Sequence, residues 1–252
     1  GFEQSVSAQY LGSLQNADST RKYARQTGET LSELGINTNL APVVDVNINP
    51  QNPVIGGIER SFSADPEVVS RQAKTYIETL HEYGIITTLK HFPGHGSSKD
   101  DSHLGVVDVT EYWEQKELVP YQNLIDSGTA DIVMTAHIFN AKLDSTYPAT
   151  LSKPIITGIL RDNLNFDGVV MSDDLQMKAI RNQYGLKETI KKSIEAGVDI
   201  LSFANNSIFD AEIAAKAHGI IIGLVEEGAI SENSIDQYYQ RIMKIKRKYL
   251  DS

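Results

Sequence analysis

Short apolar segments that end in polar or chargeable residues recur along this chain, and helix-like segments separate them. We predict strands at residues 39–46, 85–89, 131–136, 168–171 and 200–203, each followed by at least one helix. Such βα alternation is typical of a parallel sheet or barrel, because parallel strands need long crossover connections. The pattern therefore restricts the fold to the α/β class.

Helices are predicted from apolar residues at helical spacing, from capping residues and from terminal glycines. The first covers residues 18–34 with Asp18 or Ser19 as its cap, and the second begins at Asp65-Pro66 and ends at Gly84. Further helices are expected over 110–127 with an interruption near Pro120, from residue 152, around 190–194, over 208–225 and over 234–249.

Polar side chains gather at the carboxyl end of every predicted strand: Asp45, Lys90 with His91, His137, Asp173 and Asn205. A doubly wound sheet collects its site at one switch point, whereas a barrel collects residues from many strand ends. The sequence thus favours a TIM (β/α)8-type barrel, and the chain, residues 1–252, forms a single catalytic domain in this interpretation. Closure needs eight strands and five are found, so about three N-terminal strands are expected to be missing.

Composition limits the partners. The chain has 23 basic and 33 acidic residues and a formal net charge of -10, which disfavours nucleic acid and anionic membranes and favours a small or neutral ligand. Cysteine is absent, which excludes disulfides and thiolate chemistry but leaves the compartment open between bacterial cytoplasm and periplasm. No apolar run approaches the ~20 residues that span a bilayer. The N-terminus, Gly-Phe-Glu-Gln-Ser, has no signal-peptide features and does not resemble a natural beginning.

The stretch from Lys90 to Gly96, Lys-His-Phe-Pro-Gly-His-Gly, is the strongest candidate for a site, and Asp101-Ser102-His103 follows it closely. Proline and glycine end the strand there and force a sharp loop. Three histidines and two aspartates therefore lie on a loop at a strand end, where α/β folds gather catalytic groups. We call residues 90–103 the active-site loop.

Other interpretations of these residues stay open. A carboxylate at Asp173 or Asp174 could cap the following helix. Arg60 and Lys90 could be ordinary surface charges, although their positions at or just beyond strand ends favour contacts to ligand oxygens. A metal is disfavoured, because the spacing matches no common site, but imidazoles and carboxylates are available at His91, His95, His103, Asp100 and Asp101. No glycine-rich phosphate loop follows a strand, so a nucleotide is not expected.

Together these motifs resemble the family 3 glycoside hydrolases, and within them the β-N-acetylglucosaminidase branch. The resemblance is carried by the active-site loop, by Ala41-Pro42-Val43-Val44-Asp45, by Arg60-Ser61-Phe62 and by Ser172-Asp173-Asp174-Leu175. It runs through essentially the whole chain in the family's order. Members of the family have three further strands upstream, in agreement with the strand count.

The resemblance implies retaining hydrolysis that releases terminal β-linked N-acetylglucosamine from glycans or peptidoglycan fragments, as in peptidoglycan recycling. Asp173 then matches the nucleophile, and His103 matches the general acid/base with Asp101 as its partner. Asp45, Arg60, Lys90, His91 and His95 match the substrate-binding positions, with His95 shaping the loop. No metal or organic cofactor is implied. The oligomeric state stays open, and the alternatives are a β-glucosidase-type member or a non-catalytic sugar-binding fragment.

Overall fold

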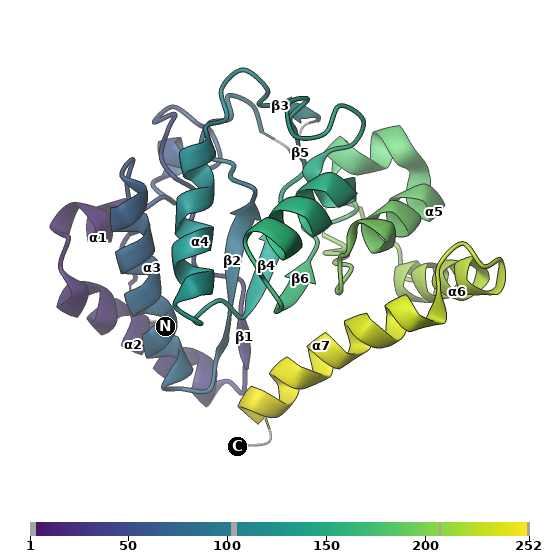
Figure 1. The fold of residues 1–252 in the computed structure, drawn as a ribbon. Coiled ribbons are helices and arrows are strands. Elements are labelled where there is room, and N and C mark those ends of the chain that lie inside the picture. Colours follow the sequence, from purple (N-terminus) through teal and green to yellow (C-terminus); the bar gives the residue numbers. More distant parts are fainter. Residues whose placement is uncertain (1–3, 102–104, 207, 251–252) are drawn as a thin grey trace.

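The computed structural model describes residues 4–101, 105–206 and 208–250. In these residues the main sheet contains β1 (Thr38–Asn39), β2 (Ile86–Phe92), β4 (Ile132–Thr135) and β6 (Val169–Met171). The strands lie in the order β1-β2-β4-β6 and are all parallel (Figure 1). The α/β prediction is therefore confirmed. The sheet is open in the described chain, because β1 and the single Met171–Ile200 bridge beside β6 form its two edges.

In the view of Figure 1, helices lie to the left and to the right of the sheet. One flank holds α1 (Ala8–Leu14), α2 (Ala17–Glu33), α3 (Pro66–His81) and α4 (Val119–Asp126), and the other holds α5 (Lys178–Ala196) and α6 (Ile213–Glu226). The start of α3 follows the predicted signal, since the Asp65 side chain accepts a hydrogen bond from Glu67 N at 2.9 Å and Pro66 occupies the first turn. Burial of Val69, Ala73, Ile77 and Leu80 then fixes the face that α3 turns inward.

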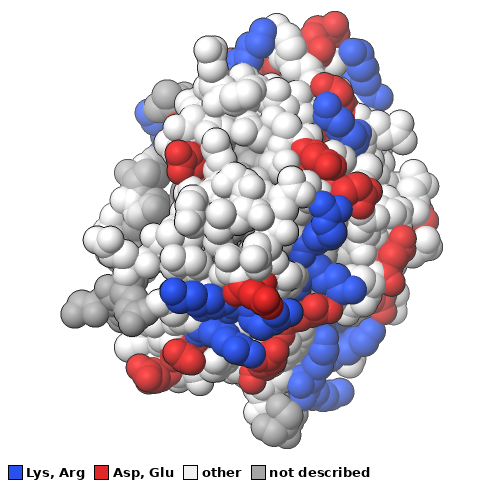
Figure 2. All heavy atoms as spheres, turned by 90° about the vertical axis from the view of Figure 1, so that its left-hand side faces the viewer, with Lys and Arg blue, Asp and Glu red and all other residues white. Residues whose placement is uncertain are grey.

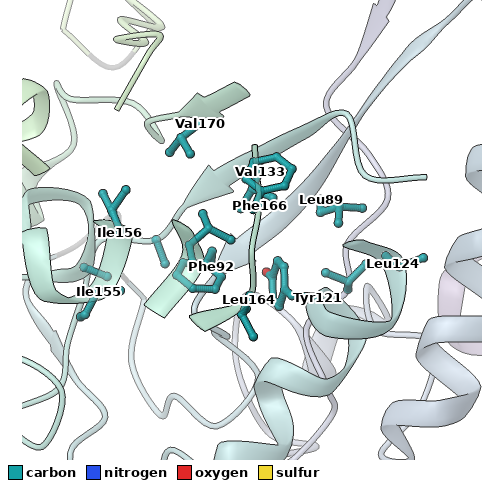
Figure 3. Close-up of a cluster of buried hydrophobic side chains, with 14 of the residues drawn as sticks. Leu89, Phe92, Tyr121, Leu124, Val133, Ile155, Ile156, Leu164, Phe166 and Val170 are labelled. Atoms are coloured by element: carbon teal, nitrogen blue, oxygen red, sulfur yellow. The ribbon is translucent and has the colours of Figure 1, made fainter. Parts of the chain in front are cut away.

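The main hydrophobic core lies between the sheet and the helices α1, α3, α4 and η4 (Pro154–Asn163), and Figure 3 shows part of it. Phe92 at the end of β2 meets Tyr121 of α4 edge to face, with ring centroids 5.1 Å apart and planes at 89°. Val133 and Val170 of the two next strands belong to the same core. The strand that carries the active-site loop is thereby held by buried side chains at its carboxyl end.

The amino ends of the strands are covered by the C-terminal helix α7 (Glu232–Leu250), which crosses below the sheet in Figure 1. Ile86, Ile132 and Val169 each begin a strand, and they form one small core with residues of α7: Ile242, Ile245 and Tyr249. At the opposite end of the sheet, where the predicted site residues lie, the strands continue into loops.

The predicted strand over 39–46 is wrong in extent. Only Thr38 and Asn39 form ladder pairs with β2, and Val43 adds one bridge to Lys90. The segment still runs beside β2, with Thr88 N donating to Ala41 O and Val44 N donating to Lys90 O, both at 2.9 Å. Pro42 has no N–H to give, so the ladder is interrupted there.

Two other predicted strands also differ from the structure. β2 continues to Phe92, beyond the predicted end at residue 89, so Lys90 and His91 are strand residues. The segment 200–203 contributes one bridge at Ile200 instead of a strand. A parallel pair that was not predicted, β3 (Val107–Asp108) and β5 (Ile138–Phe139), lies beyond the main sheet.

Several helix predictions need correction. Residues 110–127 contain η2 (Gln115–Leu118) and then α4, and Pro120 lies in the first turn of α4 instead of interrupting a helix. The cap of α2 is Asn16, not Asp18 or Ser19. The segment from residue 152 forms a π-helix, η4 (Pro154–Asn163), after the short η3 (Ala149–Leu151). The helix expected from residue 208 begins at Ile213, after a turn in which Asn205 Oδ1 accepts a hydrogen bond from Asp210 N. The remaining short helix is η1 (Gly56–Ile58).

The surface carries both signs of charge. On the face drawn in Figure 2, basic and acidic side chains alternate and leave a broad uncharged area between them. None of the helices in the described ranges is both long enough and apolar enough to cross a membrane.

Candidate active site

Three neighbouring strands bring the predicted site residues to one end of the sheet. Lys90 and His91 lie near the end of β2, His137 follows β4 by two residues, and Asp173 follows β6 by two residues. Asp45 lies on the segment that runs beside β2. Since parallel strands share one carboxyl edge, residues far apart in sequence meet there.

Asp45 organises the start of the active-site loop. Its Oδ2 accepts a hydrogen bond from His91 Nδ1 at 2.7 Å. Its Oδ1 accepts from two backbone N–H groups, those of His91 at 3.1 Å and His95 at 2.8 Å. Burial of the carboxyl works against ionisation, but the charge and hydrogen bond of His91, with smaller contributions from His95, lower the pKa of Asp45 overall. The fully buried Asp45 is therefore an ionised anchor for the loop.

His95 is held inside the loop. Its Nδ1 lies 2.7 Å from Ser98 Oγ, and its backbone carbonyl accepts a hydrogen bond from Asn52 Nδ2 at 2.7 Å. Burial, followed by the nearby charge of His91, lowers the pKa of His95 to about 4. His95 is therefore neutral near pH 7, and with 3 % of its surface exposed it fits the predicted role of shaping the loop.

Two glycines allow the loop to pass close to its neighbours. A Cβ at Gly96 would lie 1.8 Å from the carbonyl oxygen of Val46, and one at Gly94 would lie 2.6 Å from Glu117 Cβ. Gly94 also has a φ of +120°, which other residues rarely adopt. The Pro-Gly-His-Gly pattern is thus required by close backbone packing and by turn geometry.

The adjacent carboxylates Asp173 and Asp174 have different environments. Asp174 Oδ1 accepts hydrogen bonds from Gln176 N and Ala204 N, both at 3.0 Å, so this side chain holds the turn after β6. Within the described chain, Asp173 Oδ1 accepts a hydrogen bond only from Asp174 N, at 2.8 Å. Neither carboxylate caps the following helix, because α5 begins at Lys178 without a side-chain cap and both side chains accept from N–H groups outside it.

Basic side chains surround the Asp173 carboxyl. Burial raises its pKa, but interactions with His137 and His91, the N–H of Asp174 and the charge of Lys90 lower it further than burial raises it. The result is a carboxylate that stays ionised in a largely buried position. A carboxylate that is ionised and accepts a single hydrogen bond within the described chain is suited to nucleophilic attack.

His137 supports this turn from the next strand. Its Nε2 lies 2.9 Å from the carbonyl oxygen of Asp174, which can only accept, so Nε2 carries a proton. Its Nδ1 lies 2.8 Å from Thr150 Oγ1. The Thr150 hydroxyl donates to the carbonyl oxygen of Ala136 at 2.9 Å. Burial lowers the pKa of His137, so the ring is neutral near pH 7. The sequence marked His137 as a strand-end residue but gave it no role.

Lys90 and Arg60 bring positive charge to the same region. Burial, and then the charge of Arg60, lower the pKa of Lys90, while Asp173 and Asp45 partly offset this effect. Arg60 is fixed by a hydrogen bond from its NH1 to Val54 O at 2.9 Å. Both side chains are half-buried, which agrees better with a site than with ordinary surface charges.

A hollow of about 530 Å³ opens beside Asp173 and is lined in part by Met177, Ala204 and Ile208. A larger hollow of about 910 Å³ lies between η4, α5 and α7, and none of the predicted site residues lines it. The chemistry of the strand ends, not the size of the cavity, therefore identifies the candidate site.

Of the two residues predicted to act as general acid/base and its partner, only Asp101 lies in the described chain. His103 lies outside the described residues, and its pairing with Asp101 stays a prediction. Asp101 is described and half-buried. Among the described residues, no group of three or more His, Cys, Asp or Glu side chains has the arrangement of a metal site.

Comparisons with known proteins agree with this geometry. The model of the glycosyl hydrolase family 3 N-terminal domain matches residues 6–245. The β-N-acetylglucosaminidase of Paenibacillus sp. str. FPU-7, from glycoside hydrolase family 3, superimposes with a TM-score of 0.90 and 36% identity, covering 97% of this chain and 46% of that one. Beta-hexosaminidase A of Pseudoalteromonas piscicida is 33% identical over 243 residues, which are 90% of this chain and 40% of that protein. Beta-hexosaminidase LpqI of Mycobacterium tuberculosis is 38% identical over 202 residues, 77% of this chain and 51% of the relative.

The chain spans about two fifths to one half of the length of these relatives. The similarity nevertheless covers nearly all of the described residues, including every strand end discussed above. The chain belongs to glycosyl hydrolase family 3 and carries its N-terminal domain.

Proposed function

We propose that the protein is a retaining β-N-acetylhexosaminidase that removes terminal β-linked N-acetylglucosamine from glycans or peptidoglycan fragments. The relatives named above are hexosaminidases or N-acetylglucosaminidases, and they match this chain over 77% to 97% of its length. The observation that carries the proposal is the ionised Asp173 carboxylate at the end of β6, flanked by Lys90, His91 and His137.

The proposed reaction has two steps. Asp173 attacks the anomeric carbon and forms a glycosyl ester, while His103, kept protonated through Asp101, gives its proton to the departing oxygen. The neutral His103 then takes a proton from water, the water oxygen attacks the anomeric carbon, and the Asp173 carboxylate leaves. A histidine with a pKa near ~6.5 can act as acid and base in turn around neutral pH.

Substrate contacts are proposed for the charged groups around Asp173. Arg60 and Lys90 are pure donors and suit the sugar hydroxyls. His91 has its Nδ1 proton directed to Asp45, which fixes the orientation of the ring. Because Asp45 already accepts three hydrogen bonds from the loop, its main contribution in this proposal is to hold His91 and His95.

The architecture proposed for the whole enzyme is a closed (β/α)8 barrel. The five parallel segments found here would be completed by about three strands upstream, which would cover the free edge of β1 and the edge at Ile200. In this proposal residues 1–252 belong to one catalytic domain. A mass measurement of the natural gene product would test it, because a product of 27.8 kDa that melts cooperatively as a monomer would contradict it.

Two alternatives predict different activities. A β-glucosidase-type member would prefer a substrate without the 2-acetamido group, and a non-catalytic sugar-binding fragment would turn over neither substrate. The decisive experiment compares a chromogenic N-acetyl-β-glucosaminide with the matching β-glucoside, using the full-length gene product. We expect faster turnover of the acetamido sugar. Preference for the glucoside, or no turnover of either, would refute the proposal.

A further inference from the structure

Glu117 is a fully buried acidic side chain directly beneath the active-site loop. It belongs to η2, and 0% of its surface is exposed. Its Oε2 accepts a hydrogen bond from the backbone N–H of Gly96 at 2.9 Å. The reaction proposed above does not use Glu117, and the sequence gives no sign that this glutamate differs from its exposed neighbour Glu114.

The side chain also fills the space beside the loop that Gly94 leaves. A Cβ on Gly94 would lie 2.6 Å from Glu117 Cβ and 2.7 Å from its Oε2. Glu117 therefore contacts the loop at two successive glycines, by packing at one and by a hydrogen bond at the other. Few positions could constrain the path of the loop more directly.

Among the residues that the structure describes, no basic side chain pairs with Glu117. The titratable groups that face it are the carboxylate of Asp45 and the phenol of Tyr121. The Ser97 side chain lies close enough to lower the pKa of Glu117 slightly. Neither Ser97 Oγ nor Glu117 Oε1, however, has a hydrogen-bond partner within the described chain. Burial, with the nearby charge of Asp45, raises the pKa of Glu117 to about 8, so the carboxyl is neutral at pH 7.

We propose that Glu117 is a positioning residue that holds the active-site loop, and through it Lys90 and His91, in the geometry that sugar hydrolysis requires. This inference rests on the proposed function for its kinetic consequences, but its structural content concerns the loop alone. Ionisation of Glu117 adds a second negative charge to the buried region that already holds Asp45. The segment from Gly94 to Gly96 is therefore expected to keep its position against Glu117 below pH 8 and to be displaced above it.

The test uses three variants of the full-length protein. Glu117→Gln keeps the shape of the side chain and the acceptor for Gly96 N but cannot ionise. Glu117→Ala removes both the side chain that packs against Gly94 and the acceptor for Gly96 N. Glu114→Gln is the matched control, because it makes the same chemical change on an exposed residue three positions away. Thermal unfolding of each variant shows which of them fold.

Kinetics give the first readout. We expect Glu117→Ala to lower kcat by ~10- to 100-fold, since small displacements of catalytic groups have effects of that size. Glu117→Gln is expected to stay within about threefold of the wild type at pH 7 and to lose activity at higher pH than the wild type. Lys90 also titrates at alkaline pH, because its pKa is lowered, so the difference between Glu117→Gln and the wild type isolates the contribution of Glu117.

The imidazole ¹⁵N resonances of His91 and His95 give a second readout that needs no turnover. Above pH 8 they should shift in the wild type and in Glu114→Gln but not in Glu117→Gln. If the wild type has no activity, the proposed function is wrong. The role of Glu117 in holding the loop is then tested by the resonances alone. Unchanged resonances in a folded Glu117→Ala protein, or the same alkaline shift in Glu117→Gln as in the wild type, would overturn the inference.

Discussion

The buried carboxyl of Glu117 predicts an unusual dependence of stability on pH. Its pKa is raised from 4.5 to about 8 in the folded protein, because the ionised form is buried without a cation beside it. Below pH 4.5 the carboxyl is neutral in both the folded and the unfolded states and lowers stability in neither. As the pH rises from 4.5 to about 8, the carboxylate of the unfolded chain is ionised and hydrated while the native carboxyl stays protonated, so the native state loses stability until both states are ionised above pH 8.

The size of the effect follows from the pKa. Each pKa unit corresponds to ~1.4 kcal/mol, so a rise from 4.5 to about 8 costs the native state ~3 kcal/mol at pH 7 and ~5 kcal/mol above pH 8. Glu117→Gln removes this cost, because the amide does not ionise. Any constant difference between the two side chains is the same at every pH and cancels from the comparison.

Urea unfolding of the wild type and Glu117→Gln at pH 4.5, 7 and 9 provides the measurement. The free energy of unfolding of Glu117→Gln, relative to that of the wild type, should rise by ~3 kcal/mol between pH 4.5 and 7 and by ~5 kcal/mol by pH 9. Glu114→Gln should show no comparable rise. A relative stability of Glu117→Gln that is flat across this range would mean that Glu117 is ionised in the native state, and the reasoning about its burial would be wrong.

Three further substitutions test the proposed site. Asp173→Asn should abolish turnover and leave the fold intact, because an amide matches the carboxylate in shape but cannot form the glycosyl ester; rates like those of the wild type would remove Asp173 as nucleophile. His103→Ala should slow natural substrates by ~10²- to 10⁴-fold and affect the first step less for substrates with good leaving groups, and single-turnover rates equally reduced for both kinds would exclude the acid role. Gly96→Ala should destabilise the protein by ~3 kcal/mol or more, because the new Cβ meets the Val46 carbonyl oxygen, 1.8 Å away; Gly158→Ala, with open space around it, is the control in the same urea assay.

The sequence predicts local features of the fold well. Val169 to Met171 is a short buried strand with the Asp173 turn after it, and Asp65-Pro66 begins a helix, because these signals depend on neighbouring residues only. The strand over 39–46 was overextended for the opposite reason. Its pairing depends on which N–H groups β2 can reach, and Pro42 offers none.

The sequence predicts which residues belong to the candidate site but not what each side chain does there. Motif residues identify Asp45, Lys90, His91 and Asp173 as a group, yet nothing local shows that Asp174 holds the turn while Asp173 lies among basic side chains. Glu117 was missed entirely, because its role depends on burial beneath a loop about twenty positions earlier in the chain. Contacts of this kind arise from packing between segments, which periodicity and spacing do not encode.

Two acidic residues at the opposite end of the sheet explain why charge is not by itself a sign of catalysis here. Asp131 precedes β4 and accepts hydrogen bonds from His81 at 2.6 Å and Tyr249 at 2.7 Å, and Asp199 is paired with Arg161 at 2.7 Å and Arg241 at 2.8 Å. Every one of these partners comes from a helix, and the two pairs fix α7 across the amino ends of the strands. At the carboxyl ends, by contrast, Asp173 has basic groups near it but forms no ion pair within the described chain. The two ends of the same strands thus use buried carboxylates differently, one to fasten the C-terminal helix and the other to hold an ionised oxygen that is not paired.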